Sequence, residues 1–505
     1  MTISDPQAAE GATESHEPAP GNTLPPRPSP VRNAAVYFAI ALLIAIPCVW
    51  QPHIQANDLS SHLYNAWLAN QVSAGELKGL YLAPQFTNVL FDHLLSLLLR
   101  TGSLVWTERI AVLLAVQVFF WGCFACASAL GGRPAWTLAP FLALLAYGSV
   151  FRMGFFNFYI SAGICLWAVA LIWRNRPGVR LLAIPLLLMA WTAHSLPCAW
   201  AAAVIGYVFV ARRLKPGQRW WLAGGGLIAL PGLALWLAGS FPSRWTGGLR
   251  VDSMFGADQV LIYGFKYKFL ATALLCFWIL LLLQRFAKPP SPAGETVFQL
   301  WVLNAAACLV LPDAVWLPFY AGGLSFLTMR LSLLSGILFC GVIASVPVKT
   351  PHKLLAVALS ILFFGCSYWD ERTLNSVEQR VARAVTTLPP GAHAVSTLQD
   401  SRLNPWALEH VLDRACIGRC FDFVNYEPST TQFRLRAQPG NAYVISDYQD
   451  LVDLERGQLI FQRTDIDLYR LSPCRPTGEI CVSRVKPGDR LAKDQVAPGS
   501  EPLEK

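Results

Sequence analysis

Asp58 and His62 are the two residues of this sequence that most directly suggest chemistry. They lie four residues apart in a polar run, Asn57-Asp58-Leu59-Ser60-Ser61-His62, that follows closely on an apolar segment. If Asp58 opens a helix, His62 lies on the same face one turn later. A carboxylate and an imidazole so placed can bind a metal ion, or act as a general base with an orienting partner. The alternative is that Asp58 caps a helix beginning at Leu59, with His62 an interfacial polar residue.

Two arginines and a further histidine are candidates for binding an anion. The guanidinium groups of Arg152 and Arg330 could pair bidentately with a phosphate of a lipid carrier, or could equally extend to ordinary lipid phosphate. His194 precedes Ser195-Leu196-Pro197 between two unusually short apolar segments. Short or Pro-interrupted segments often mark backbone that lines a cavity. The alternative for His194 is a hydrogen bond to neighbouring backbone.

Three other polar residues are secondary candidates. Asn157 lies close to Arg152, where one apolar segment ends and the next begins. Asp92 and His93 form a second acid and imidazole pair within residues 51–108. We expect these three side chains to take part in binding an acceptor.

The elements that must position these side chains are apolar segments of membrane-spanning length. About 11 can be placed along the chain, each near the length that crosses about 30 Å of hydrocarbon. They are residues 33–50, 109–130, 134–151, 156–173, 181–194, 196–211, 220–239, 264–284, 297–312, 330–347 and 353–369.

The distribution of Lys and Arg predicts which ends of these segments face the cytoplasm. A cytoplasmic N-terminus places the basic loops around Arg133, 174–180, 212–219, 285–288 and 349–353 inside, as the positive-inside rule requires. The apolar stretch 89–99 would invert every later loop if it spanned, so we expect it to lie on the outer face. All the candidate residues then lie on the outer side, together with the chain after residue 369.

Composition supports an integral membrane protein and gives no sign of nucleic-acid binding. Hydrophobic residues make up 54% of the chain and charged residues 14%, against about one quarter charged in soluble domains. The net charge of +9 comes largely from basic loops, which suit contact with anionic membrane lipids. Residues 1–32 and 491–505 are polar and lack apolar runs, which predicts disordered tails.

Cysteine placement suggests two disulfides in the part of the chain predicted to be outside. Nine of the 13 cysteines lie in apolar segments, whereas Cys416, Cys420, Cys474 and Cys481 follow residue 370. Four cysteines allow three connectivities, and we expect each to pair with its nearer neighbour, Cys416 with Cys420 and Cys474 with Cys481. A zinc site is the alternative.

The polar residues 370–490 predict a small α/β domain. Residues 375–387 have helical spacing, and a turn signal separates them from a strand-like run at 392–398. Residues 442–446, 459–462 and 468–471 also look like strands. The fold expected is therefore mainly α, a polytopic transmembrane domain at 33–369 with a first outer loop at 51–108, and a C-terminal α/β domain at 370–490.

With this topology the chain resembles the GT-C membrane glycosyltransferases, including the dolichyl-phosphate-mannose mannosyltransferases and aminoarabinose transferases. The resemblance rests on the acidic site in 57–62, the amphipathic region 59–99, the stretch Gly154-Phe155-Phe156-Asn157-Phe158 and the C-terminal outer domain. The chain also looks like a group of uncharacterised bacterial membrane proteins with a similar Asp-x-x-x-His loop. It departs from the protein O-mannosyltransferase branch, which has adjacent acidic residues where this chain has Asn57-Asp58.

The resemblance implies an enzyme of the bacterial inner membrane that transfers a sugar from a polyprenyl-phosphate donor to an acceptor on the outer face. Asp58 would act as base or orient the acceptor, His62 would assist, and Arg152, His194 and Arg330 would bind the donor phosphate. No cofactor is implied except, in some branches, a divalent cation. The alternatives are a non-catalytic membrane scaffold and a transporter for a lipid-linked substrate.

Overall fold

The computed structural model describes residues 30–245, 247, 250–287, 292–318, 322–344, 346, 349–399, 407–474, 478–492 and 494–495. Residues 1–29 and 496–505, which hold most of the two predicted tails, lie outside this set. The chain divides into two compact units, residues 1–43 and 44–505. Helix α1 (Pro30–Ala45) belongs largely to the first unit. The remaining helices and strands belong to the second.

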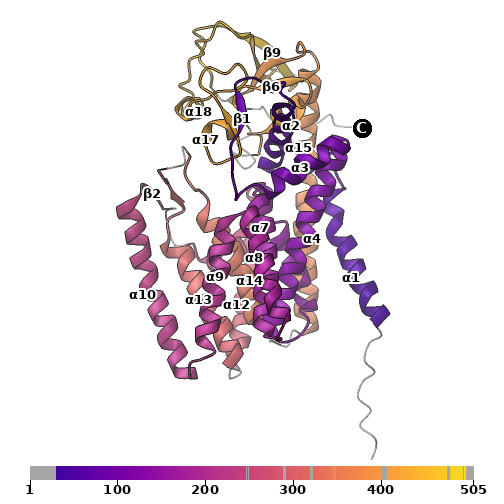
Figure 1. The fold of residues 1–505 in the computed structure, drawn as a ribbon. Helices are drawn as coiled ribbons and strands as arrows, with labels where there is room; N and C mark the ends of the chain where they lie inside the picture. The colour runs from indigo at the N-terminus through magenta and orange to yellow at the C-terminus, as the bar shows by residue number, and fades with distance from the viewer. Residues whose placement is uncertain are drawn as a thin grey trace, which may run out of the picture. The chain divides into compact units, whose positions relative to one another are not determined.

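The second unit is mainly helical (Figure 1). Its α-helices are α2 (Asn57–Ser73), α3 (Leu90–Thr101), α4 (Leu104–Gly131), α5 (Ala139–Ala146), α6 (Ser149–Arg152), α7 (Phe156–Arg174), α8 (Ala183–Ala193), α9 (Ser195–Ala211), α10 (Pro216–Ser240), α11 (Val251–Phe255), α12 (Lys266–Phe286), α13 (Pro292–Val310), α14 (Leu327–Ile343), α15 (Thr350–Val385), α16 (Val411–Cys416), α17 (Glu427–Thr430) and α18 (Tyr448–Glu455). Short 3₁₀ helices are η1 (Ile46–Cys48), η2 (Trp136–Leu138), η3 (Val179–Leu182) and η4 (Ala257–Val260).

The helices are compatible with a multi-pass membrane protein. Among the described residues, six helices are long and apolar enough to cross a membrane, namely α4, α7, α10, α12, α13 and α15. Four shorter apolar helices occupy 34–48, 179–193, 195–211 and 327–343. The segment predicted at 134–151 is divided among η2, α5 and α6, so the expected number of 11 spans is not established.

Helix α15 joins the apolar part of the chain to its C-terminal residues. It runs for 36 residues, a length of about 54 Å at 1.5 Å per residue, and so exceeds the hydrocarbon thickness of about 30 Å. The predicted span at 353–369 and the predicted helix at 375–387 are parts of this one helix. Its C-terminal half therefore extends past any membrane-crossing part and is available to pack with other polar elements.

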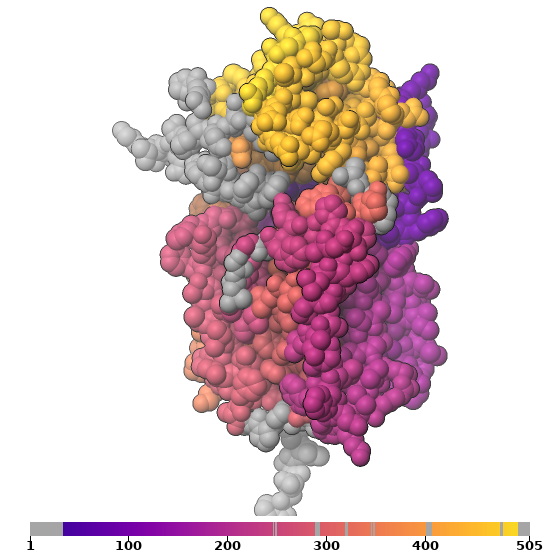
Figure 2. Space-filling model, turned by 90° about the vertical axis from the view of Figure 1, so that its left-hand side faces the viewer, coloured from indigo at the N-terminus to yellow at the C-terminus, as the bar shows by residue number. Residues whose placement is uncertain are grey.

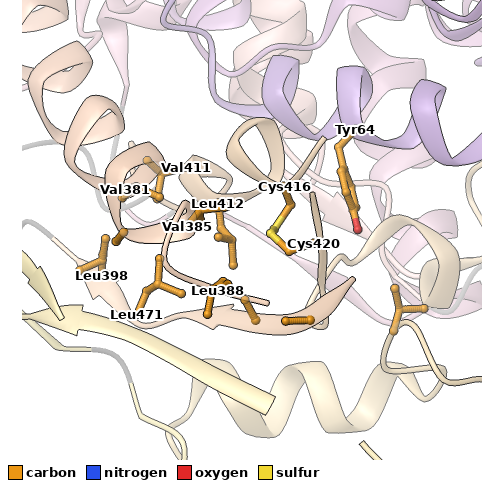
Figure 3. Close-up of a cluster of buried hydrophobic side chains, with 14 of the residues drawn as sticks. Tyr64, Val381, Val385, Leu388, Leu398, Val411, Leu412, Cys416, Cys420 and Leu471 are labelled. Carbon is orange, nitrogen blue, oxygen red and sulfur yellow. A yellow bond between two sulfur atoms is a disulfide. The ribbon is translucent and has the colours of Figure 1, made fainter. Parts of the chain in front are cut away.

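Residues after α15 share a hydrophobic core with the region between α1 and α4. Tyr64 and Leu68 of α2 pack in one cluster with Val381 of α15 and Leu412 of α16. Figure 3 shows Tyr64 beside this cluster, which also contains Leu471 and the Cys416–Cys420 disulfide. Strand β1 (Leu80–Leu82) pairs antiparallel with β7 (Leu435–Ala437). The C-terminal residues are thus packed against the early part of the chain; in Figure 2 they lie at one end of the second unit.

The C-terminal residues contain a four-stranded mixed sheet in the order β6-β4-β8-β9. Strand β4 (Ala392–Ser396) is parallel to β6 (Cys420–Asp422) and β8 (Leu468–Pro473), and β9 (Ile480–Val485) is antiparallel to β8. Minor strands are β2 (Ser243–Arg244), β3 (Ala314–Val315), β5 (Leu398–Gln399) and β10 (Asp494–Gln495). The α/β prediction is right for 392–398 and 468–471, whereas 442–446 and 459–462 form no strand.

Both predicted disulfides are present. Cys416 pairs with Cys420, and Cys474 pairs with Cys481, so each cysteine bonds its nearer neighbour as expected. The first bridge joins the end of α16 to the start of β6, inside the hydrophobic cluster shared with α2. It therefore fixes a short connection at the base of the sheet.

Candidate functional site

Asp58 lies in the first turn of α2, in a position fixed by a close backbone contact. The helix begins at Asn57 with Ala56 as its N-cap, so Asp58 does not cap a helix that starts at Leu59. The backbone N–H of Asp58 donates to the carbonyl of Met153 at 3.2 Å. Gly154, at φ +79°, permits this approach, because a Cβ there would lie 2.6 Å from the Asp58 nitrogen. A carboxylate in a helix's first turn is also favoured by the helix dipole.

The Asp58 carboxylate faces a second polar side chain from the C-terminal residues. Its Oδ1 lies 3.6 Å from Nε2 of His410, and it accepts a 3.4 Å hydrogen bond from Nδ2 of Asn57. About 15% of the side chain remains accessible. Burial raises the pKa of Asp58 above the ordinary value, and His410, His62 and Arg330 partly oppose this rise. Asp58 is therefore a more basic carboxylate than an exposed aspartate.

His410 is held in place by Asp413, three residues later. Its Nδ1 lies 3.0 Å from Oδ2 of Asp413, a carboxylate that is fully buried. Burial alone would lower the pKa of His410, but the hydrogen bond to Asp413 and the neighbouring acids raise it to about 10. The imidazole is therefore cationic at neutral pH and directs positive charge at Asp58.

His62 belongs to a different network of buried charged side chains. Its Nδ1 lies 3.0 Å from Asp92 and 3.4 Å from Glu427 of α17, and all three side chains are buried. Asn157 donates to Asp92 at 3.1 Å and accepts from the backbone N–H of Phe91 at 2.8 Å. The structure thus brings together three residues proposed from the sequence, His62, Asp92 and Asn157, and adds Glu427.

Proton binding in this network is shifted by burial and by mutual charge. Burial would lower the pKa of His62, but Asp92 and Glu427 raise it to about 9. Burial raises the pKa of Glu427 to about 8, with His62 opposing the rise. At neutral pH the network therefore holds an imidazolium beside ionised Asp92, with Glu427 largely protonated.

Arg330 is the candidate whose hydrogen-bonding capacity is least used. Its Nε and Nη1 atoms are buried, and neither has a hydrogen-bond partner within the described part of the chain. The guanidinium lies over the ring of Phe155 at 4.4 Å and near that of Phe158 at 5.5 Å, at the start of α7. It interacts electrostatically with Asp58 and Asp313. The aromatic stretch 155–158 therefore contacts a cation that interacts electrostatically with the Asp58 carboxylate.

His194 lies on the same side of α7 as Arg330. It is the N-cap of α9, and its Nδ1 accepts the backbone N–H of Leu196 at 3.1 Å. Its ring meets the edge of Phe158 at 5.7 Å, and Arg330 acts on it electrostatically. Since Nδ1 accepts, a neutral His194 carries its proton on Nε2, which can donate to another group.

Arg152 is buried in an internal ion pair. Its Nη2 donates to Glu371 and, at 2.6 Å, to Ser367, both on α15, and its Nη1 donates to the carbonyl of Gln55 at 2.8 Å. His93 lies 3.4 Å from Arg434, which also bonds Ser96 and the Asp92 carbonyl. Arg152 and His93 thus both have protein partners.

Within the described residues, no group of three or more His, Cys, Asp and Glu side chains is arranged to hold a metal ion. Sequence reasoning missed His410, Asp413 and Glu427, which come from the predicted C-terminal α/β domain. The only local signal for them was the spacing of His410 and Asp413, three residues apart as on one helical turn.

The chain was compared with protein-family models, with curated proteins and with solved structures, and none of the three gave a match. The geometry of the site therefore carries the functional argument alone.

Proposed function

We propose that this protein is a membrane glycosyltransferase that takes a sugar from a polyprenyl-phosphate donor, with Asp58 as base and Arg330 as the donor-phosphate ligand. The observation that carries the proposal is the pair of buried Arg330 donors without a described partner, on a guanidinium that interacts electrostatically with Asp58. A phosphate oxygen accepts hydrogen bonds from guanidinium donors, so a bound phosphate would supply an acceptor to a donor of Arg330 that has none among the described residues.

The position of Arg330 in α14 also favours an anionic ligand. It lies in the first turn of the helix, where the dipole already presents positive charge. A buried cation at that end is costly unless negative charge lies nearby. Asp58 and Asp313 supply part of that charge. A bound phosphate would complete it, and His194 could donate to the same group through Nε2.

The proposed reaction uses Asp58 and Arg330 at opposite ends of the transferred sugar. Asp58 accepts the proton of an acceptor hydroxyl, and the oxygen forms a bond to the anomeric carbon. The bond from that carbon to the phosphate oxygen breaks, and its electron pair leaves with the polyprenyl phosphate. Arg330 stabilises the charge that develops on this leaving group. His410 orients Asp58 and keeps its carboxylate ionised to lower pH than burial alone would allow.

The test measures transfer of radiolabelled sugar from a panel of polyprenyl-phosphate donors, in membranes containing wild type, Asp58→Asn or Glu76→Gln. Asp58→Asn preserves shape and removes the base, while Glu76→Gln changes an exposed acid beyond α2. We expect transfer in wild type and in the Glu76 variant, and loss of at least a hundredfold in Asp58→Asn. The wild-type rate should fall as pH falls through the raised pKa of Asp58.

Equal transfer in wild type and Asp58→Asn would remove Asp58 from the mechanism. Absence of transfer from every donor in wild-type membranes would contradict the enzyme proposal, and would favour a scaffold or a transporter.

A further inference from the structure

A cleft opens beside the start of α2, where Asn57 precedes Asp58. It is partly open to solvent. Its lining comes from the start of α2, the turn after α6, the loop before α12, α15 and the start of α16. The lining includes the polar side chains of Gln55, Asn57, Arg152, Glu378 and His410.

Three polar atoms of this lining are buried and unused. Within the described chain, Nε2 of Gln55, Oδ1 of Asn57 and Nε of Arg152 have no hydrogen-bond partner. Gln55 is 7% exposed and Arg152 is 6% exposed, so neither group is satisfied by open solvent. A buried donor or acceptor without a partner costs about 1–3 kcal/mol, which a ligand that pairs with it recovers.

The charged groups around the cleft are already compensated by protein partners. Arg152 pairs with Glu371, and Glu378 accepts two 2.7 Å hydrogen bonds from Arg414. His410 pairs with Asp413 and approaches Asp58. A ligand with a net charge would disturb these pairs. The unused groups comprise two donors and one acceptor, a combination that neutral hydroxyl groups match because each both donates and accepts.

We propose that this cleft binds a small neutral polyhydroxylated molecule, with Gln55 and Arg152 donating to its hydroxyl oxygens and Asn57 accepting from a hydroxyl. Asn57 and His410 both contact the Asp58 carboxylate, so a hydroxyl of the bound molecule lies next to the base. That the molecule is the sugar end of the acceptor rests on the proposed function. Binding of a polyhydroxylated molecule in the cleft does not depend on the proposed function.

The test is saturation-transfer difference NMR on the purified full-length protein, in a detergent whose head group is not a sugar. The probes are methyl glycosides of glucose, galactose, mannose and arabinose, with cyclohexylmethanol as an apolar control. We expect at least one glycoside to bind and cyclohexylmethanol not to bind. Gln55→Met should weaken that binding at least tenfold while leaving the Gln55 carbonyl bond to Arg152 intact.

Two further variants separate this inference from folding defects and from the phosphate site. Gln71→Met alters a glutamine of α2 that does not line the cleft, and should bind the glycoside as wild type does. Arg330→Lys should also retain glycoside binding, because Arg330 lies outside the cleft. Asn57→Ala, as a second cleft variant, should weaken binding even if Gln55→Met does not fold.

Failure of this inference is distinct from failure of the proposed function. Glycoside binding that depends on Gln55 or Asn57, without sugar transfer from any donor, would support the cleft and contradict the transferase. Sugar transfer without binding of any glycoside would support the transferase and overturn the cleft. Equal binding to wild type and both cleft variants would also overturn it.

Discussion

Arg152 and Arg330 looked equivalent in the sequence and differ in the structure. Both were candidates for the same donor phosphate. Arg152 donates to Glu371, Ser367 and the Gln55 carbonyl, whereas two donors of Arg330 have no partner among the described residues. The fold therefore supplies acceptors to the guanidinium of Arg152, whereas two donors of Arg330 are left without an acceptor in the part of the chain that the structure describes.

This difference separates a buried arginine that stabilises the fold from one that is available to bind a ligand. A guanidinium paired with a buried carboxylate fastens two parts of the chain, here α6 and α15, and its loss should appear as instability. A guanidinium that packs on aromatic rings and has donors without an acceptor contributes little to the stability of the fold. Its loss should appear in ligand binding and catalysis.

The largest effect is expected on stability, from Arg152→Met. Removing one partner of a buried pair leaves the Glu371 charge uncompensated, which costs about 3–5 kcal/mol. The free energy of unfolding, measured by SDS titration of the detergent-solubilised protein, should fall by that amount. The double variant Arg152→Met/Glu371→Leu should recover much of the loss. Wild-type stability in the single variant would show that the pair does not fasten α6 to α15.

Arg330→Met should reduce sugar transfer strongly and stability only slightly. We expect sugar transfer to fall by about 10²–10³, as on loss of one donor to a developing negative charge. The free energy of unfolding should change by less than about 1 kcal/mol, because no described protein hydrogen bond to Nε or Nη1 is lost. Transfer assays and SDS titrations on the same preparation check both. Destabilisation as large as that of Arg152→Met would abolish the contrast between the two arginines.

Gly154→Ala should displace Asp58 together with the start of α2. The added Cβ would lie 2.6 Å from the Asp58 nitrogen and 2.9 Å from that of Leu59, so the start of α2 must move. A shift of about 1 Å in the base can cost about a hundredfold in rate. Gly178→Ala is the matched control, because Gly178 has φ +78° and nothing within 4 Å. Equal transfer rates in the two variants would mean that backbone strain, and not the displaced base, governs the effect.

The smallest effect concerns the paired network of His62 and Glu427. Both groups bind protons more tightly in the folded protein, at pKa values of about 9 and 8 against ordinary values of 6.5 and 4.5. Stability should therefore fall as pH rises, between 4.5 and 8 for Glu427 and between 6.5 and 9 for His62, by about 1–3 kcal/mol. His62→Gln should flatten this dependence in thermal unfolding scans. A wild-type Tm that is constant over this pH range would show that the network does not take up these protons on folding.

The sequence predicts those parts of this molecule that are determined by residues close together in the chain. Long apolar runs specify α4, α7 and α12 because hydrophobic periodicity is read within one segment. The polar run 57–62 likewise predicts the helix that carries Asp58. The pairing of neighbouring cysteines was predictable because each bridge closes a short loop.

The partners of the candidate residues could not be predicted, because each comes from a distant part of the chain. His410 faces Asp58, and Glu427 faces His62, only once the C-terminal residues pack on α2. Nothing near Arg152 in sequence indicates Glu371 on α15, 219 residues away. Two donors of Arg330 lack an acceptor because none of the described side chains that surround it supplies one. The sequence around Arg330 does not show which side chains will surround it.

The shared core of α2 with the C-terminal residues has a consequence for biosynthesis. Tyr64 accepts the backbone N–H of Asp422, 358 residues further along the chain. At ribosomal rates of about 5–20 residues per second, the first half of the site waits tens of seconds for the second. Until then the apolar face of α2 lacks its cover and is open to chaperones or proteases. Nonsense mutations anywhere before residue 410 would therefore remove the His410 side of the site along with part of the core that holds α2.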